Sequence, residues 1–424
     1  MKIQRTLPPA AAPIFLRDLL CGIGGLISKK REIERFKAEI REYFGVRHCF
    51  LVSSGKAAFA VILEALKTIY PGRTEVLIPA FTCFSIPSAI VRAGLKVRLC
   101  DITRDSLDFN FDQLSKIIRE TEHTPVPKSC PILCVVPTHL FGLHSDIERV
   151  KELAAGQGIA VIEDAAQVMA GEHRGKKLGT LGNAGFFSLG RGKAISVVEG
   201  GIVVTNEDRI ARAIEAVFQG LPEYRADGLL RLFFSAAALS LFLHPNLFWL
   251  PKALPFLRLG ETIYDPRFAM MKMSSFQAGM TKGWQNKLKE FRKHRAENSK
   301  HWASLAEIKH TQPYLFENGN YADMTRFPVR IDDTEVKDWL LREADCMRLG
   351  IMPTYPDCVA GIQELTGRFK GKTFPVAKRA AHSLVTLPIH SFVSGKDREK
   401  IEKMIFAMGS LNKKRSFKSD SKNP

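Results

Sequence analysis

An aspartate, a serine and a lysine lie close together in one segment of the chain. Asp164 ends the apolar run VIED, Ser188 ends the apolar run GFFS, and Lys193 lies in the glycine-rich turn that follows. The run EGGIVVTN then returns as a third strand. A lysine amine attacks aldehydes and ketones, a carboxylate keeps a ring nitrogen protonated, and a hydroxyl beside free backbone N–H groups binds phosphate.

Together these groups fit pyridoxal 5′-phosphate (PLP) as a cofactor. Lys193 would form a Schiff base with the aldehyde, and Asp164 would hold the pyridine nitrogen protonated so that the ring withdraws electrons. The alternative is an ordinary strand pair with a solvated lysine, which is the better interpretation of an isolated lysine in a glycine turn. The ordered set with Gln167 and the E-G-G run at 199–201 favours the cofactor site.

A second candidate phosphate site lies earlier in the chain. CFLVSS (49–54) is predicted to be a buried strand, and the following turn with Ser54, Gly55, Lys56 and Ala57 leads into a helix. The first N–H groups of that helix are free at the carboxyl end of the strand, which is a phosphate site by geometry. Taken alone, a tight turn without a ligand explains the pattern equally well. Lys56 either assists phosphate binding or points to solvent.

The chain resembles the DegT/StrS family of PLP-dependent sugar aminotransferases, which have the fold-type I architecture. The resemblance rests on E-D-A-A-Q (163–167), G-x-x-G (179–182), F-S (187–188), a lysine five residues after the serine, and E-G-G (199–201). It implies that Asp164 pairs with the pyridine nitrogen and that Gln167 lies by the ring hydroxyl. It also implies that Ser188 contacts the phosphate and that Lys193 is the Schiff-base lysine. It covers about residues 33 to 220 closely and 265 to 405 loosely.

Further segments match the family with differences. Ser54, Gly55, Ala57 and Ala58 match an S-G-T-A-A segment in which Lys56 replaces the threonine. Cys83 stands where the family carries a ring that stacks on the cofactor, so the neighbouring Phe84 is the candidate for that contact.

Two residues are candidates for substrate contact. His139 matches an H-x-x-G loop, and Tyr355 matches one member of a tyrosine–histidine pair whose histidine is missing here. A structural role is the stronger expectation for His139, because a lone histidine is more often structural. Met270 stands where the family has an asparagine that reaches across the dimer to the cofactor phosphate.

The composition of the chain limits the classes of partner that we expect it to bind. The formal net charge of +18 favours anionic partners such as phosphorylated substrates or membrane surfaces, and no nucleic-acid motif accompanies it. The eight cysteines lack the spacing of a zinc site, so we expect reduced thiols and no metal. Arg17 and Asp18 interrupt the apolar N-terminal run, so we expect no signal peptide.

The order of patterns predicts an α/β fold with a mostly parallel sheet flanked by helices and a smaller α/β C-terminal domain. We expect an N-terminal arm and helix (1–44), a large PLP-binding domain (45–265), connecting helices (266–310), a small domain (311–411) and a basic disordered tail (412–424). By resemblance, two copies form a homodimer.

Residues 228–261 are unusually apolar, with no formal charge from Leu232 to Pro251. His244, Pro245 and Asn246 interrupt the run, so we predict a helical hairpin inserted in the large domain rather than a membrane span. It would pack internally or on a partner subunit, or make a peripheral contact with a membrane through its basic flanks.

The resemblance implies an aminotransferase that moves an amino group from an amino acid, with glutamate as the expected donor, to a keto sugar. The sugar would be nucleotide-linked and the pathway surface-polysaccharide or amino-sugar biosynthesis, in the cytoplasm with possible membrane association. Lys193, in place of the histidine of related dehydratases, favours aminotransfer. Two alternatives stay open: another PLP reaction on an amino acid, and a non-catalytic scaffold or regulator at the membrane.

Overall fold

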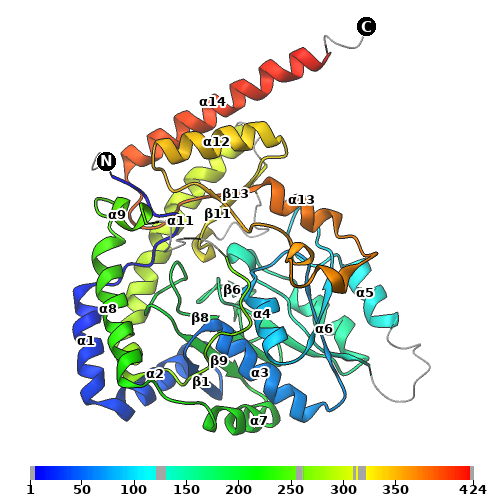
Figure 1. The fold of residues 1–424 in the computed structure, drawn as a ribbon, viewed down its shortest axis with the longest axis vertical. Coiled ribbons are helices and arrows are strands. Elements are labelled where there is room, and N and C mark those ends of the chain that lie inside the picture. The colour runs from blue at the N-terminus through cyan, green and yellow to red at the C-terminus, as the bar shows by residue number, and fades with distance from the viewer. Residues whose placement is uncertain are drawn as a thin grey trace.

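The computed structural model describes residues 5–120, 130–254, 260, 262–308, 312–313 and 321–420. Its largest feature is a seven-stranded sheet with the order β1-β9-β8-β5-β4-β2-β3 (Figure 1). The five strands from β8 to β3 run parallel, and β9 is antiparallel to both β8 and β1. The strands are β1 (His48–Val52), β2 (Glu75–Pro79), β3 (Lys96–Cys100), β4 (Ile132–Val135), β5 (Ala160–Asp164), β8 (Ala184–Ser188) and β9 (Gly201–Thr205). The predicted mostly parallel sheet is confirmed.

Helices cover both faces of this sheet, because alternate strand residues point to opposite sides. Phe50 and Val52 of β1 join a core with one set of helices, whereas Cys49 and Leu51 join a second core. The first set is α3 (Gly55–Ile69), α4 (Ser85–Arg92) and α7 (Asp208–Gln219). The opposite face is covered by α2 (Lys29–Phe44) near β1 and by α5 (Phe111–Glu120) and α6 (Ile147–Ala155) near β2 and β4.

A four-stranded antiparallel sheet forms the smaller C-terminal part, with the order β10-β11-β13-β12. The predicted small α/β domain is thereby confirmed. Its elements are β10 (Gln312–Pro313), β11 (Phe327–Arg330), α12 (Thr334–Cys346), β12 (Met352–Pro353), α13 (Pro375–Ser383), β13 (Leu384–Leu387) and α14 (Gly395–Asp420). Two connecting helices, α10 (Ser275–Met280) and α11 (Trp284–Ile308), lead into it from the large sheet.

The two parts are joined by polar contacts as well as by a shared core. Asp101, directly after β3, accepts hydrogen bonds from the backbone N–H groups of Val376 (3.1 Å) and Ala377 (2.8 Å) in the first turn of α13. A carboxylate at a helix N-terminus is favourable because the N–H groups there lack helical partners. Asp101 therefore fixes α13 over the carboxyl edge of the large sheet.

The N-terminal arm lies against the small domain before entering α1 (Leu16–Ile27). Leu7 is buried and its N–H donates to the carbonyl of Arg348. The ring Nε2 of His390 donates to the carbonyl oxygen of Pro8 at 2.8 Å. Gly192, next to Lys193, is so close to Ala10 that an added Cβ would lie 3.1 Å from the alanine methyl. The arm therefore connects the small domain with the lysine turn.

The apolar segment differs in part from the predicted hairpin. It forms α8 (Ala226–Phe242) and a single short turn of helix, α9 (Trp249–Lys252), and residues 255–259 and 261 lie outside the described part of the chain. α8 runs beside α1 at the edge of the molecule (Figure 1). Only Leu232 and Ala236 of α8 are buried, while Leu230 and Phe234 are 57% and 61% exposed. Among the described residues, no helix combines the length and hydropathy needed to cross a bilayer.

The C-terminal tail also differs from the expectation. α14 continues to Asp420, so residues 412–420 are helical rather than disordered, and residues 421–424 lie outside the described part. The polar residues there include lysine and arginine, which are good helix formers and extend a helix that has already begun. Figure 1 shows this helix projecting from the small domain.

Candidate active site

The start of α3 and the end of β8 form a narrow cradle. Ser54 is the N-cap of α3, and its hydroxyl accepts a hydrogen bond from the N–H of Ala57 at 3.1 Å. A Cβ built on Gly55 would lie 2.8 Å from Cβ and 3.0 Å from Oγ of Ser188, so a larger residue would not fit. The helix N-terminus supplies N–H groups and Ser188 a hydroxyl, and this combination suits a phosphate.

Lys56 points away from this cradle. Its ammonium lies 4.0 Å from a carboxylate oxygen of Asp265 and 4.8 Å from the centre of the Phe268 ring. Lys56 therefore has an acidic and an aromatic neighbour, and it does not simply point to solvent. These contacts engage the Lys56 ammonium without a phosphate.

Asp164 is held rigidly at the end of β5. Its backbone N–H donates to Pro137 and its carbonyl accepts from the N–H of His139, both at 3.0 Å. Side-chain Oδ1 accepts from the N–H of Ala166 at 3.0 Å, and Oδ2 has no hydrogen-bond partner among the described residues. Burial raises the pKa of Asp164, and the bond from Ala166 and the nearby Lys193 charge oppose that rise. A cationic ring nitrogen would supply the partner that Oδ2 lacks.

Glu163, the other acid of this strand end, has a structural role. It is fully buried and accepts hydrogen bonds from the backbone N–H groups of Gly179 (2.8 Å), Gly182 (2.6 Å) and Leu181. These bonds fix the loop between β5 and β8. The backbone of the G-x-x-G segment (179–182) thus surrounds the Glu163 carboxylate, and this contact gives the segment a structural role.

His139 lies behind Asp164 and is fully buried. The N–H of Ser145 donates to Nδ1 at 3.1 Å, so the proton is on Nε2, which donates to Glu163 at 3.1 Å. Both ring nitrogens are therefore used inside the protein. This position fits the structural role that was the stronger expectation for His139, rather than a contact with substrate.

Lys193 lies in the turn between β8 and β9, where its N–H donates to the carbonyl of Gly190 at 3.3 Å. Its side chain keeps some accessible surface, yet loss of solvation lowers the pKa of the amine. Cys83 and Asp164 act in the opposite direction, and Arg326 lowers this pKa further. A lowered pKa increases the fraction of neutral amine, which is the nucleophilic form.

Arg295 of α11 holds the backbone of this turn from below. Its Nη2 donates to the carbonyl oxygens of Lys193 at 3.0 Å and Ala194 at 2.9 Å. The side chain is buried, and burial lowers the pKa of Arg295 to about 10. The sequence analysis missed this residue, because nothing in the motif points to a helix that begins about 90 positions later.

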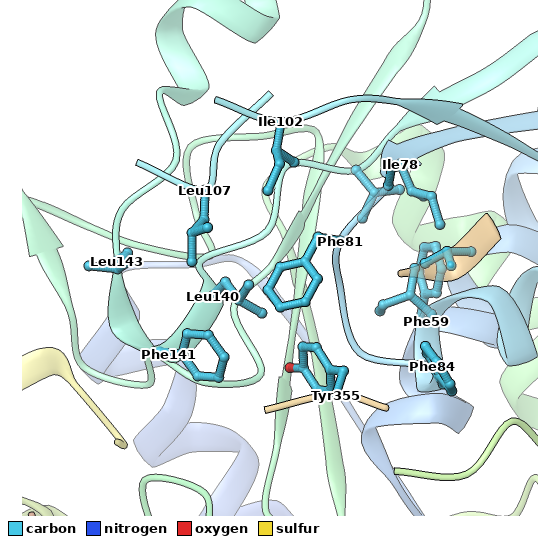
Figure 2. Close-up of a cluster of buried hydrophobic side chains, with 14 of the residues drawn as sticks. Phe59, Ile78, Phe81, Phe84, Ile102, Leu107, Leu140, Phe141, Leu143 and Tyr355 are labelled. Atoms are coloured by element: carbon cyan, nitrogen blue, oxygen red, sulfur yellow. The ribbon is translucent and has the colours of Figure 1, made fainter. Parts of the chain in front are cut away.

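Tyr355 and Gln167 meet beside Asp164. Gln167 Nε2 donates to the Tyr355 hydroxyl at 3.2 Å, which brings a predicted substrate residue and a predicted cofactor residue together. The Tyr355 ring is buried among Phe81, Phe84 and Phe141, with centroid distances of 5.4, 6.5 and 6.0 Å (Figure 2). Burial raises the pKa of Tyr355 well above its ordinary value, so its hydroxyl stays protonated.

Phe84 belongs to this cluster rather than to the open part of the site. Its ring is 6% exposed and lies at 23° to that of Tyr355, whereas Cys83 is partly exposed. The expected stacking of Phe84 on the cofactor therefore does not fit its position. The Cys83 thiol lies 3.2 Å from the Ser85 hydroxyl, and this residue keeps the accessible surface that Phe84 lacks.

Arg326 is a further residue that the sequence analysis missed. It immediately precedes β11, and its Nη1 lies 3.8 Å from the Met352 sulfur. Its charge acts on the pKa values of Lys193 and Tyr355. In the sequence it is one of 62 basic residues, so residue type alone gives no signal.

These positions fit PLP as the sequence predicted. Asp164 offers a carboxylate oxygen for a protonated ring nitrogen, Lys193 an amine for the aldehyde, and the cradle of Gly55 and Ser188 a phosphate site. The three lie at neighbouring strand ends, because β5 pairs with β8 and β8 with β9. PLP bound there would supply an electron-withdrawing ring next to Lys193.

Comparisons with known proteins give the family and the fold of the chain. The chain is 32% identical over 186 residues to a pleiotropic regulatory protein of Geobacillus stearothermophilus, covering 44% of this chain and 47% of that protein. It is 32% identical over 197 residues to a GDP-perosamine synthase of Vibrio cholerae, covering 46% and 50%. These alignments thus span about half the length of the curated relatives.

The fold is similar to that of Helicobacter pylori PseC, an aminotransferase involved in the biosynthesis of pseudoaminic acid. The TM-score is 0.74 at 14% identity, over 96% of this chain and 100% of that one. The model of the DegT/DnrJ/EryC1/StrS aminotransferase family, whose members depend on PLP, matches residues 21–406. The chain belongs to the DegT/DnrJ/EryC1/StrS aminotransferase family.

Proposed function

We propose that this chain is a PLP-dependent aminotransferase that transfers an amino group from an amino acid to a keto sugar. The observation that carries the proposal is the placement of Asp164 and Lys193 at neighbouring strand ends, beside the cradle of Gly55 and Ser188. A regulatory protein that had lost the chemistry would have no need to keep this set together.

In the proposed reaction, PLP supplies an aldehyde and an electron sink. The Lys193 amine would hold the cofactor through its aldehyde, and as a free amine it would accept and return the proton of the reacting carbon. Its lowered pKa leaves more of the amine neutral and ready to accept that proton. Asp164 would keep the ring nitrogen protonated, and Gln167, which donates a hydrogen bond to the Tyr355 hydroxyl, would be available to a polar group of the ring.

Family membership supports an amino-group donor and a sugar acceptor as the two substrates. A GDP-perosamine synthase among the relatives supports a nucleotide-linked keto sugar as the acceptor, and glutamate is the proposed donor. The product would be an amino sugar for surface polysaccharide or a related pathway. The cationic chain, with a net charge of +18, suits a phosphorylated acceptor.

Transfer of labelled nitrogen tests this proposal. The purified protein with PLP is incubated with glutamate carrying an isotopic label in its amino group and with a panel of nucleotide-linked keto sugars. We expect label in one amino-sugar product by mass spectrometry and none with Lys193→Ala. If label leaves glutamate but appears in no sugar, the acceptor class is wrong; if glutamate is altered without nitrogen transfer, the chain catalyses a different PLP reaction.

We also propose that the protein acts in the cytoplasm as a homodimer, as the family resemblance implies. The exposed apolar residues of α1 and α8, including Leu16, Leu20, Leu230 and Phe234, form a surface that a partner or a membrane would cover. Peripheral contact with an anionic membrane is supported by the basic residues Arg225 and Arg231 at the same helix. Light scattering after size-exclusion chromatography gives the molar mass in solution and tests whether the protein is a dimer.

A second candidate function is a scaffold or regulator. It is favoured by the exposed apolar surface of α8 and by the relative that is named as a pleiotropic regulatory protein. This alternative predicts that the protein binds a membrane or partner equally well when Lys193 is replaced by alanine. It also predicts no spectral response to any amino acid.

A further inference from the structure

Asp323 is a fully buried carboxylate that joins a connecting helix and a loop of the large domain. It ends the short helix η3 (Tyr321–Asp323), just before β11. Its Oδ1 lies 2.7 Å from Nη2 of Arg292 on α11, and its Oδ2 accepts a hydrogen bond from Nε2 of His144 at 3.1 Å. A buried charge is costly unless opposite charge and hydrogen bonds compensate for the lost water. Both oxygens of Asp323 have such a partner.

The loop between β4 and α6 lies directly against η3. The N–H of Thr325 donates to the carbonyl oxygen of Phe141 at 3.0 Å. Gly142 has a φ of +99°, and a Cβ built on it would lie 2.3 Å from the carbonyl oxygen of Asp323, so the two backbones meet without a side chain between them. The ring of Phe141 lies at 20° to that of Tyr355, with 6.0 Å between the centroids (Figure 2). The loop therefore connects η3 with Tyr355.

Arg292 extends the contact to the segment that carries Gln167. Its Nη1 donates to the carbonyl oxygen of Ala170, three residues after Gln167. Ala170 has a φ of +71°, which is uncommon for a residue with a side chain, so this backbone needs support from its surroundings. Gln167 Nε2 in turn donates to the Tyr355 hydroxyl at 3.2 Å. The two routes from the buried carboxylate, through the guanidinium and through the loop, converge on Gln167 and Tyr355.

We infer that Asp323 is a positioning residue that acts through Arg292 and fixes Gln167 where it meets the cofactor. The inference rests on the proposed function and makes the placement of Gln167 depend on the small domain. Arg292 and Arg295 are three positions apart on α11, so one side of this helix holds both the Gln167 segment and the lysine turn. Loss of the Asp323 charge should release the Gln167 segment and leave the Arg295 contacts with the lysine turn in place.

The affinity of the cofactor-free protein for PLP, followed by absorption, tests the inference. Asp323→Asn keeps the size of the side chain and removes the charge that holds Arg292. We expect its affinity for PLP to fall by about 2- to 10-fold, as for the loss of one hydrogen bond, while the lysine-dependent band still forms. Asp332→Asn is the control. It breaks a half-exposed ion pair with Arg104 (2.7 Å) that also joins the two domains, and it should bind PLP as wild type does.

A double-mutant cycle shows whether Asp323 acts through Gln167. Gln167→Ala alone should weaken PLP binding at least as much as Asp323→Asn does, and the double variant should bind no more weakly than Gln167→Ala. Losses that add in the double variant overturn the inference. A loss in Asp332→Asn equal to that in Asp323→Asn also overturns it, because any ion pair between the domains would then have the same effect.

Arg292→Lys provides a second variant and carries the test if thermal melts show that Asp323→Asn does not fold. A lysine ammonium lacks the fork that spans the Ala170 carbonyl and Asp323, so we expect a similar loss that again disappears in the Gln167→Ala background. Wild type that binds PLP, with unchanged affinity in the folded variants, overturns the inference alone. Wild type that binds no PLP overturns the proposed function and the inference with it, so the two failures are distinguishable.

Discussion

Arg295 and Lys193 are 102 positions apart, yet the guanidinium of Arg295 donates a hydrogen bond of 3.0 Å to the carbonyl oxygen of Lys193. The same nitrogen reaches the carbonyl of Ala194 at 2.9 Å. A buried cation thus caps two carbonyls of the turn that carries the proposed catalytic amine. Arg295 thereby links α11, which leads to the small domain, to the turn of the large domain that carries Lys193.

Replacement of Arg295 by leucine should loosen the lysine turn. Two buried carbonyls would lose their donor, so we expect a loss of roughly 2–4 kcal/mol in the free energy of unfolding. We also expect a slower reaction with glutamate, because Lys193 is then less precisely placed. Urea denaturation and stopped-flow absorption measure the two effects.

The matched control for Arg295 is Lys293→Ala, an exposed residue of the same helix. It should change the unfolding free energy by less than about 0.5 kcal/mol and leave the reaction rate as it is. If Arg295→Leu behaves like this control, the turn does not depend on the arginine.

Alanine at Gly55 should weaken PLP binding. The added Cβ would lie 2.8 Å from the Cβ of Ser188, and the overlap would widen the cradle or displace the start of α3. Overpacking of this kind costs about 1–3 kcal/mol, which corresponds to a loss of roughly 5- to 150-fold in affinity. Titration of the cofactor-free protein with PLP gives the affinity. Gly24→Ala, at a helical glycine with open space around it, should bind PLP normally.

The cofactor site was predictable to the extent that its residues are neighbours in sequence. Asp164, Ser188 and Lys193 lie within one stretch of strands, so their order and spacing describe both chemistry and geometry. Phe84 shows the limit of this reasoning. It follows the partly exposed Cys83, and its own ring packs into the core at the start of α4.

Acidic pH should destabilise the protein through His390. Burial lowers the pKa of His390 to about 4, whereas an unfolded histidine titrates near 6.5. The His390 ring is neutral in the folded protein. The stability that depends on this neutral ring is therefore fully present above about pH 6.5 and is lost as the pH falls toward 4. The loss by pH 4.5 should reach about 2–3 kcal/mol.

Urea unfolding at several pH values measures this dependence. His390→Gln keeps a donor for the Pro8 carbonyl and removes the titrating ring, so its stability should fall less steeply between pH 6.5 and 4.5 than that of wild type. His382→Gln replaces an exposed histidine of α13 and should retain the wild-type slope. Equal slopes for wild type and His390→Gln would show that another group is responsible.

The exposed side of α8 should bind anionic vesicles. Leu230 and Phe234 are more than half exposed and have basic neighbours, so we expect wild-type protein to sediment with phosphatidylserine vesicles at low salt and less so at high salt. Replacement of both residues by asparagine should abolish sedimentation. Phe406→Asn, at an exposed phenylalanine of α14, serves as the control. Wild-type protein that stays in the supernatant at low salt rules out this membrane contact.

The distant residues of the site could not have been predicted from this single sequence. Arg295 comes from α11 and reaches the lysine turn only when that helix has packed against the large domain, and Arg326 lies just before β11 of the small domain. Both are arginines in a chain with 62 basic residues, and neither lies in a recognisable motif. His139 is the opposite case. Its H-x-x-G motif can be recognised in the sequence, but its burial against Glu163 becomes evident only in the structure. Local patterns identify the chemical groups, whereas long-range packing decides which of them face the substrate.

The most direct test of the central claim is the absorption spectrum of the purified protein with PLP, before and after glutamate is added. We predict a band at the edge of the visible range in wild type that is absent in Lys193→Ala. Glutamate should remove this band and produce one typical of the aminated cofactor. A protein that shows no lysine-dependent band in the presence of PLP would contradict the assignment of Lys193. A band that persists unchanged with glutamate and every other amino acid would contradict the proposed aminotransfer.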